Sequence, residues 1–128
     1  MVRNSFLLDT HVFIWCMEEN KRLSEDIKKK IADPENKNFI SVATVWEIII
    51  KKTTKQIKFH FDLENSIKKT GFEVIPIQIS HVLNVSELPL YHKDPFDRIL
   101  ISQAQVENLV FITSDEKIWK YNVAILRC

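Results

Sequence analysis

Short runs of apolar residues alternate with helical segments along the whole of this chain. The first run, Ser5–Asp9, reads Ser-Phe-Leu-Leu-Asp and shows no alternation of polar and apolar residues, which is typical of a strand buried on both faces. We expect four further strands, over Asn38–Val42, Phe72–Ile77, Leu109–Thr113 and Val123–Leu126. Strands separated by helices favour βαβ crossovers, so the sequence predicts an α/β fold in which helices cover both faces of a parallel sheet of about five strands.

The helical segments between these runs carry start and stop signals. Ser24 and Asp62 suit N-cap positions, and Gly71 suits the residue that ends a helix. The segment from Ala43 to about Lys55 predicts an amphipathic helix, because apolar residues recur there at i, i+3, i+4 and i+7. These residues are Val42, Val45, Trp46 and Ile49. The other helices are expected over Thr10–Glu19, Ser24–Asp33, Asp62–Lys69, Ser80–Leu88 and Ser114–Tyr121, with one more that begins at Pro95.

Length and charge limit the classes of protein that need to be considered. The chain has 128 residues, and we expect residues 1–128 to form a single domain with a substantial core. The formal net charge is only +1, so a nucleic-acid role would need a local patch or a bound cation. Gly71 is the only glycine, which excludes glycine-rich phosphate loops. The sequence shows no signal peptide and no run long enough to span a bilayer, so we expect a cytoplasmic protein with no membrane partner.

The stretch from His92 to Ala104 reads as a turn that leads directly into a helix. Asp94 suits the N-cap, and Pro95 suits the first helical position, where its missing N–H costs nothing. Asp97 falls at the third helical position, so capping alone would account for both acids. Asp97 nevertheless shares its side of the helix with three apolar residues, which are Leu100, Ile101 and Ala104. A carboxylate aimed at a buried face needs a partner, because an unpaired buried charge is costly.

Other acids fall where the predicted fold would bring them to the same place. Asp9 ends the first strand, Asp115 follows the fourth, and Glu47 lies one turn into the helix after the second. In parallel sheets, sites form outside the carboxyl ends of the strands, near a switch in strand order. Carboxylates crowded there repel one another and raise their own pKa values, and a hard divalent cation relieves that repulsion. The sequence therefore predicts a Mg²⁺ or Mn²⁺ site with oxygen ligands, beside the helix that carries Asp94 and Asp97.

Each of these acids also has a structural explanation when it is taken alone. Asp9 suits a helix cap, and Asp115 suits the first turn of a helix. Glu47 is placed to pair with Lys51, four residues later on the same helix. The joint interpretation is stronger than any single one, because the carboxyl-end rule brings the acids together independently.

The basic and histidine side chains near the acids have either a structural role or a role in contacting a substrate. A basic edge near Glu47 is either a solvated helix face or a contact for the phosphates of a single strand; it consists of Lys51, Lys52, Lys55 and Lys58. Arg98 is placed to contact a phosphate or to brace an acid, and His11 either touches a substrate or is structural. The remaining histidines have no ligand spacing, and we assign no chemistry to His60, His81 or His92.

Four segments of the chain carry the acids in characteristic surroundings: Phe6–Trp15 (FLLDTHVFIW), Ser41–Ile48 (SVATVWEI), His92–Ala104 (HKDPFDRILISQA) and Phe111–Asp115 (FITSD). Together they resemble PIN-domain ribonucleases of the VapC-like toxin type. Their order and spacing extend over essentially the whole chain, which makes the resemblance specific. The region after Gln56 lacks the Gly-Lys-Leu pattern frequent in the family, so the resemblance carries no substrate contacts over to it.

The resemblance implies a fold and a set of site residues. The fold would be a three-layer α/β/α sandwich. By position, the family's acidic quartet corresponds to Asp9, Glu47, Asp97 and Asp115, which would serve as catalytic and metal-binding residues, with Asp94 as an extra acid of the subgroup. Contacts to the substrate are expected from Thr10, His11, Lys51, Arg98 and Ser114.

The resemblance also implies an activity and partners. The protein would be a Mg²⁺- or Mn²⁺-dependent endoribonuclease that hydrolyses RNA phosphodiester bonds with metal-activated water, and the toxin of a toxin–antitoxin pair. It would form a homodimer and bind a small cognate antitoxin that inserts into the site or covers it.

Three alternatives fit parts of the same pattern. A PIN-type RNA-processing nuclease outside a toxin–antitoxin pair would share the acids. A phosphatase with a nucleophilic aspartate usually has a second acid two residues after the first, where this chain has His11. A non-enzymatic metal-binding interaction domain of the receiver type would have paired acids after the first strand, whereas Asp9 stands alone there.

Overall fold

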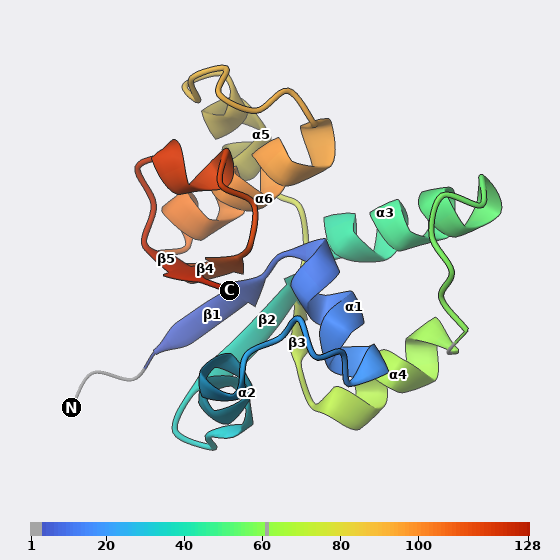
Figure 1. The fold of residues 1–128 in the computed structure, drawn as a ribbon. Helices are drawn as coiled ribbons and strands as arrows, with labels where there is room; N and C mark the ends of the chain where they lie inside the picture. Colours follow the sequence, from blue (N-terminus) through green and yellow to red (C-terminus); the bar gives the residue numbers. More distant parts are fainter. Residues whose placement is uncertain (1–3, 61) are drawn as a thin grey trace.

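In the described part of the chain, five parallel strands form one sheet at the centre of the fold (Figure 1). The computed structural model describes residues 4–60 and 62–128, so residues 1–3 and 61 of the expected domain lie outside the described part. The strands are β1 (Ser5–Leu8), β2 (Lys37–Ser41), β3 (Glu73–Ile75), β4 (Val110–Thr113) and β5 (Ile125–Arg127). They lie in the order β3-β2-β1-β4-β5, and every neighbouring pair is parallel. The predicted α/β fold with a five-stranded parallel sheet is therefore confirmed.

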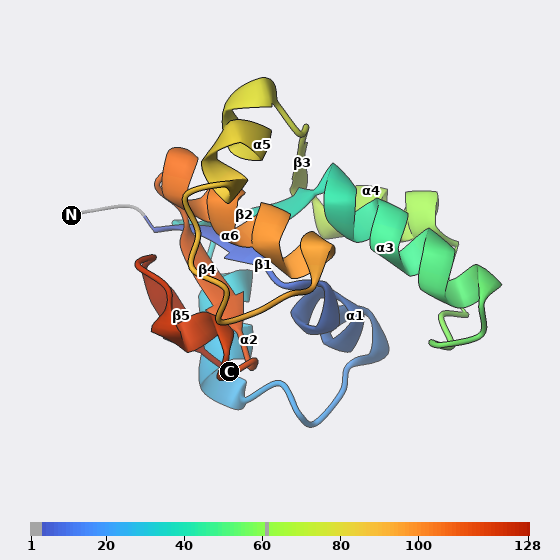
Figure 2. The same cartoon turned by 90° about the horizontal axis from the view of Figure 1, so that it is seen from above.

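Helices cover both faces of this sheet. They are α1 (Thr10–Glu18), α2 (Glu25–Ala32), α3 (Val42–Thr53), α4 (Leu63–Thr70), α5 (Ile79–Val85) and α6 (Pro95–Val106). Figures 1 and 2 show α1 and α2 on one face and α5 and α6 on the other. Helix α3 lies at the carboxyl end of the sheet, where it contacts both α1 and α6. Among the described residues, no helix is both long enough and apolar enough to cross a membrane.

The sheet separates two hydrophobic clusters. Phe6 and Leu8 of β1 point into the cluster beneath α1 and α2, whereas Leu7 points into the cluster beneath α6. Successive side chains of a strand point to opposite faces, so one apolar strand serves both clusters. All three residues are at most 2% exposed. This double burial explains why the run shows no polar–apolar alternation in the sequence.

The order in which the strands are added to the sheet reverses at β1. The connection through α1 and α2 leads to β2 on one side of β1, and β4 lies on its other side. Asp9 follows β1 directly, and its backbone N–H donates to the carbonyl of Ile112 in β4 at 3.0 Å. The gap between the carboxyl ends of β1 and β4 is therefore the topological switch point at which ligands bind in open parallel sheets.

Helix α3 forms where it was predicted, but most of its apolar stripe is exposed. Val42, Trp46 and Ile49 are 43%, 57% and 52% exposed, whereas Thr44 and Glu47 are buried. The helix turns its polar residues inward because they contact Thr10 of α1 at the carboxyl end of the sheet. Of the four apolar residues that predicted the helix, Val45 packs against the core and the other three are exposed, so the periodicity located the helix but not its buried face.

The expected helix over Ser114–Tyr121 is wrong. Only Ile118–Lys120 form a short 3-10 helix, η1, and the preceding residues form turns. Asp115 accepts a hydrogen bond from the backbone N–H of Lys117, which closes such a turn. The remaining helices and strands lie where they were predicted, with ends that differ by up to three residues.

Gly71 ends α4 in the left-handed conformation, with φ of +70°, as the sequence predicted. A Cβ atom at this position would have no heavy atom within 4 Å, so a substitution meets no clash. We expect Gly71→Ala to lower the free energy of unfolding by about 1 kcal/mol, because a side chain disfavours positive φ. Urea denaturation measures this change. Gly71→Asn should cost less, since asparagine tolerates the left-handed region, and equal stability of Gly71→Ala and the wild type would contradict the explanation.

Candidate functional site

Five carboxylates line one pocket at the carboxyl end of the sheet. The pocket has a volume of about 300 Å³ and contains all of the acids that the sequence pointed to: Asp9, Glu47, Asp94, Asp97 and Asp115. They come from the ends of β1 and β4 and from helices α3 and α6, elements far apart in the sequence. The structure also places His11, Lys51 and Ser114 on the pocket wall. Two further residues were predicted to contact the substrate. Thr10 is buried, and neither Thr10 nor Arg98 lines the pocket.

Asp9 is held by neighbours on both sides. Its Oδ1 accepts from the backbone N–H of His11 at 3.3 Å, which is the capping role expected for it alone. Its Oδ2 accepts from the Thr113 hydroxyl at 2.6 Å, across the gap between β1 and β4. Burial raises the pKa of Asp9, although the hydrogen bond from Thr113 and the nearness of His11 lower it. Capping therefore uses only one oxygen of this carboxylate, and the residue also lines the pocket.

Glu47 is almost fully buried and is paired on each oxygen. Its Oε1 accepts from the Thr10 hydroxyl at 2.7 Å, and its Oε2 contacts the Lys51 ammonium at 2.5 Å. Burial by itself lowers the pKa of Lys51, but the hydrogen bond with Glu47 and the surrounding negative charges outweigh it and raise that pKa. The Glu47–Lys51 pair expected from helical spacing is present. It lies inside the pocket, where Lys51 provides a positive charge among the acids.

Asp94 caps helix α6, whereas Asp97 faces the pocket. Asp94 accepts from the backbone N–H groups of Phe96 and Asp97 at 2.8 and 3.2 Å, so it is the N-cap of α6 as predicted. Asp97, one turn into the helix, directs its carboxylate into the pocket instead. Leu100, Ile101 and Ala104, which the sequence placed on the same side of α6 as Asp97, are buried, and Asp97 itself is partly buried.

Asp115 is fixed by the turn after β4. Its backbone N–H donates to the Thr113 hydroxyl at 3.1 Å, and its Oδ1 accepts from the Lys117 N–H at 2.9 Å. Thr113 therefore orients two acids at once, because the same hydroxyl donates to Asp9. The side chain of Lys117 lines the pocket as well, a contact that sequence reasoning missed.

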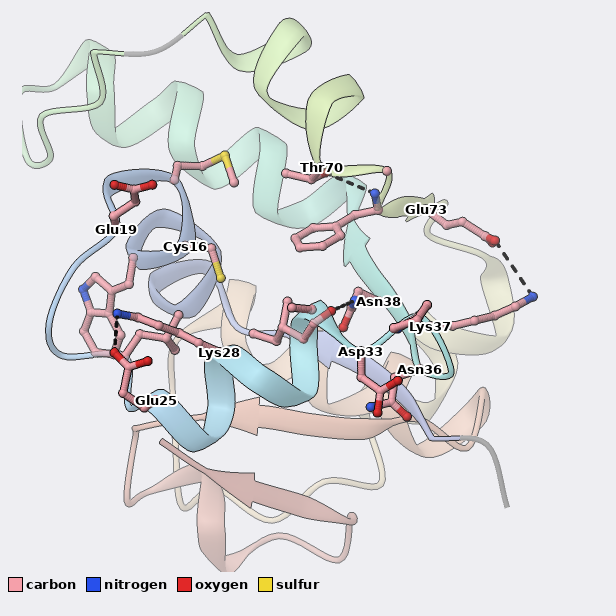
Figure 3. Close-up of a pocket in the computed structure, with 18 of the residues that line it drawn as sticks. Cys16, Glu19, Glu25, Lys28, Asp33, Asn36, Lys37, Asn38, Thr70 and Glu73 are labelled. Carbon is pink, nitrogen blue, oxygen red and sulfur yellow. Dashed lines mark hydrogen bonds and ion pairs between the residues drawn. The ribbon is translucent and has the colours of Figure 1, made fainter. Parts of the chain in front are cut away.

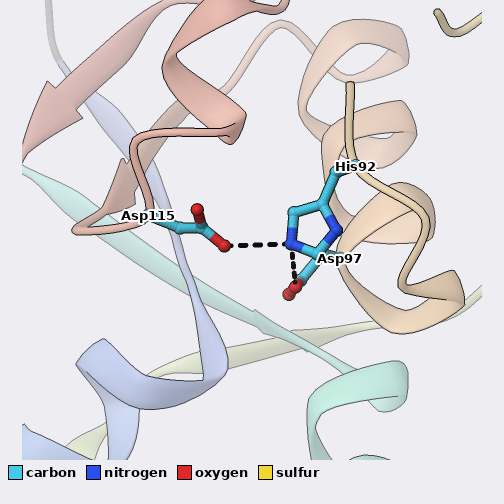
Figure 4. A group of neighbouring side chains, drawn as sticks. All are labelled: His92, Asp97 and Asp115. Atoms are coloured by element: carbon cyan, nitrogen blue, oxygen red, sulfur yellow. Dashed lines mark hydrogen bonds and ion pairs between the residues drawn. The ribbon is translucent and has the colours of Figure 1, made fainter. Parts of the chain in front are cut away.

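His92 is the largest omission of the sequence interpretation. Its Nε2 lies 2.9 Å from an oxygen of Asp97 and 2.9 Å from an oxygen of Asp115, as Figure 4 shows. These three ligand atoms all lie within 4.8 Å of one another. Ligand spacing in the sequence gave no hint of this contact. The available signal was its position two residues before the N-cap of the helix that carries Asp97.

Arg98 braces the segment before α6. Its guanidinium donates to the carbonyls of Val85, Leu88, Pro89 and His92 at 2.9–3.3 Å, and its Nη1 lies 3.4 Å from the Tyr121 hydroxyl. Its side chain is therefore engaged with the backbone that leads to His92, and it is not part of the pocket lining.

The electrostatics of the pocket favour a bound cation. Burial, together with the charges of Asp9, Asp94, Glu47 and Asp115, raises the pKa of Asp97 to about 8. Lys51 contacts only Glu47 among the acids, so the other carboxylates keep a strong mutual repulsion. A small pocket lined by carboxylate oxygens matches the hard oxygen donors that Mg²⁺ and Mn²⁺ prefer. The residues present thus fit a divalent cation.

A larger groove lies elsewhere on the molecule and has a different character. It has a volume of about 920 Å³ and runs between α1, α2 and the start of β3, with apolar residues such as Leu23, Ile31 and Phe72 in its lining (Figure 3). Four of its charged residues form two pairs of opposite sign, Glu25 with Lys28 at 3.3 Å and Glu73 with Lys37 at 4.0 Å. Acids and lysines are mixed in this groove, whereas five carboxylates gather in the smaller pocket, so the smaller acidic pocket is the candidate site.

Known proteins resemble the chain in sequence pattern and in structure. The family model of the PIN domain matches residues 6–123. A chain of VapBC2 from Rickettsia felis, solved with a DNA fragment from its promoter, has a TM-score of 0.73 and 14% identity, over 96% of this chain and 98% of that one. A chain of a toxin–antitoxin complex from Klebsiella pneumoniae has a TM-score of 0.64 and 20% identity, over 94% of each chain.

A third solved structure agrees with these two. A chain of FitAcB from Neisseria gonorrhoeae has a TM-score of 0.66 and 17% identity, over 95% of this chain and 96% of that one. No curated protein matches the chain. At these identities, the similarity to solved structures concerns the fold alone.

The raised pKa of Asp97 predicts a measurable effect on stability. The Asp97 carboxyl binds its proton more tightly in the folded protein than in the unfolded chain. The contribution of Asp97 to the free energy of unfolding therefore falls as pH rises from about 4 to about 8. We expect Asp97→Asn to raise the melting temperature in EDTA by about 4 °C or more at pH 8, and by less at pH 5. Differential scanning calorimetry measures both values.

The matched control for this change is Asp26→Asn, on the exposed face of α2, which should show no such pH-dependent gain. A gain from Asp97→Asn that is the same at pH 5 and pH 8 would contradict the electrostatic explanation.

Proposed function

This chain belongs to the PIN domain family, and from that premise we propose that it is a divalent-metal-dependent endoribonuclease and the toxin of a toxin–antitoxin pair. PIN domains are nucleases as a family, and PIN nucleases use divalent metal ions. The observation that carries the proposal is the convergence of five acids from four separate elements on one pocket. Burial and the neighbouring acids raise the pKa of Asp97 there to about 8. A cluster of this kind suits a cation-assisted hydrolysis of a phosphodiester.

The acids have distinct roles in this proposal. Asp9 and Asp97 would hold Mg²⁺ or Mn²⁺ most directly, and Glu47 and Asp115 would complete the oxygen set or orient water beside it. When bound, the cation would lower the pKa of a water molecule and offset the charge of the phosphate oxygens. Asp94 caps α6 and adds negative charge near Asp97, which supports a secondary role for it.

Cationic and hydroxyl side chains around the pocket suit an anionic substrate. Lys51 and Lys117 line the pocket, so both would contact RNA phosphates, and His11 and Ser114 line the same pocket. Thr10 would act indirectly, because its hydroxyl donates a hydrogen bond that holds Glu47 in place. The role that the structure supports for Arg98 is positional, since its guanidinium holds the segment that leads into α6.

The solved structures support the proposal of an antitoxin partner. Those from Rickettsia felis and Klebsiella pneumoniae are of VapBC2 and of a toxin–antitoxin complex, and this chain shares their fold over at least 94% of its length. We propose a small antitoxin as the cognate partner. A short reading frame that encodes a DNA-binding protein directly upstream would distinguish a toxin from an RNA-processing nuclease outside such a pair.

We also propose that the protein forms a homodimer through α5. Ile79, Val82 and Leu83 are 79%, 53% and 67% exposed, and their spacing puts them on one face of the helix. Apolar side chains gathered in this way on a soluble surface mark an interaction site. A second copy of the chain suits such a face, because twofold dimers bring identical patches together.

The catalytic proposal is tested by RNA cleavage. We expect the wild type to cleave single-stranded RNA with Mg²⁺ or Mn²⁺ and to lose this activity in excess EDTA. Asp97→Asn should lower the rate by about 100-fold or more while the fold persists, because it removes a charged oxygen ligand. Gel electrophoresis of labelled RNA measures cleavage, and circular dichroism measures folding.

The control for this experiment is Asp26→Asn, which makes the same chemical change on an exposed helix and should leave the rate unchanged. Full activity of Asp97→Asn, or undiminished cleavage in EDTA, would overturn the assignment. Metal binding without cleavage of any RNA would instead favour a non-enzymatic interaction domain, and turnover of a phosphomonoester would favour a phosphatase.

The dimer proposal is tested by charge insertion. Leu83→Glu should convert the dimer into a monomer, because it places an unpaired carboxylate within an apolar contact. Sedimentation velocity measures the mass in solution. Lys29→Glu, on the exposed face of α2 in the opposite helix layer, should leave the dimer intact. A wild-type protein that sediments as a monomer, or a dimer that persists in Leu83→Glu, would count against this interface.

A further inference from the structure

His92 holds a fixed place between two acids of the pocket. Its side chain is only 12% exposed, and its Nε2 lies 2.9 Å from Asp97 on α6 and 2.9 Å from Asp115 on the turn after β4 (Figure 4). Sequence reasoning gave this residue no role, and neither the capping of α6 nor the acidic quartet requires an imidazole here. The contact joins two elements that otherwise face each other with charges of the same sign.

The other ring nitrogen determines what the imidazole is able to do. Nδ1 lies 3.1 Å from the backbone nitrogen of Asp94, whose N–H can only donate. Nδ1 is therefore the acceptor, and the hydrogen of the neutral ring is on Nε2. An Nε2–H donates to carboxylates and has no free lone pair for a cation. Ligation of a metal through Nε2 would require the ring to move its hydrogen and give up the bond to Asp94.

The backbone of His92 is fastened as firmly as its ring. Its N–H donates to the Tyr121 hydroxyl at 2.9 Å, and its carbonyl accepts from the Arg98 guanidinium at 3.1 Å. Tyr121 in turn donates to the carbonyl of Pro89 at 2.6 Å. These bonds connect the segment before α6 to the segment after η1, so the imidazole is held in place from both directions.

We propose that His92 is a positioning residue of the metal centre, whose Nε2–H orients the Asp97 and Asp115 carboxylates without itself binding the ion. The inference rests on the metal-dependent function proposed above and extends it to a residue outside the acidic quartet. Donors behind ligating carboxylates set the orientation of the ligand oxygens, and their loss typically lowers metal affinity by about 10- to 100-fold.

A pair of amide substitutions separates the two ring nitrogens. The amide of His92→Asn reaches the place of Nδ1, so its oxygen keeps the bond from Asp94, but no donor remains near Asp97 and Asp115. The amide of His92→Gln reaches the place of Nε2 and keeps that donor. We expect His92→Asn to weaken Mn²⁺ binding by about 10- to 100-fold and His92→Gln to stay within a few-fold of the wild type.

Electron paramagnetic resonance of Mn²⁺ titrated into the metal-free protein measures these affinities without any RNA. The exposed His60→Gln serves as the control and should leave the affinity unchanged. Electron spin echo modulation of the bound Mn²⁺ should show no directly coordinated nitrogen. Thermal unfolding in EDTA checks that each variant is folded.

The outcomes separate this inference from the nuclease proposal. Equal Mn²⁺ affinity of wild type and His92→Asn, or a nitrogen bound directly to Mn²⁺, would overturn the role of His92 and leave the nuclease standing. Weakened binding in His92→Asn with rescue in His92→Gln would support it, even if no RNA is cleaved and the nuclease proposal fails. A wild type that binds no Mn²⁺ would overturn both.

Discussion

Mutual repulsion among carboxylates that are buried or partly buried is the constraint on which the rest of this structure depends. Five acids share a pocket of about 300 Å³, and their charges combine with burial to raise the pKa of Asp97 to about 8. A folded chain tolerates such a cluster only if the surrounding structure holds it together, because each acid alone would be more stable in water. The sheet and its two hydrophobic clusters provide that support, and the acids lie at the edge where β1 and β4 end.

Hydroxyl, ammonium and imidazole groups contact four of the five acids in the pocket. The Thr113 hydroxyl links Asp9 to the turn that carries Asp115, and the Thr10 hydroxyl fixes Glu47 from the opposite wall. Lys51 offsets the charge of Glu47, while His92 lies between Asp97 and Asp115. These contacts connect α1, α3, α6 and the turn after β4, so the pocket itself joins the elements that form it. The same contacts leave the carboxylates oriented for a cation.

The contacts of the pocket determine which residues of helix α3 are buried and which are exposed. Thr44 and Glu47 face inward to serve the pocket, and Trp46 and Ile49 consequently face outward. Trp46 packs edge-on against Phe96 of α6, with ring centroids 5.1 Å apart, so its exposure is only partial. An amphipathic helix in a globular protein ordinarily buries its apolar stripe. Here the demand for polar groups at the carboxyl end of the sheet outweighs that tendency.

The sequence alone determined the α/β class, the parallel sheet, the approximate positions of the six α-helices and the five acids of the pocket. These features follow from local rules: apolar runs form buried strands, short polar residues cap helices, and acids at strand ends meet at one edge of a parallel sheet. The tertiary structure alone decided which face of α3 is buried, that Arg98 is bound to backbone carbonyls, and that His92 lies between two acids. Such features depend on contacts between residues far apart in the chain, whose geometry no local pattern of residues encodes.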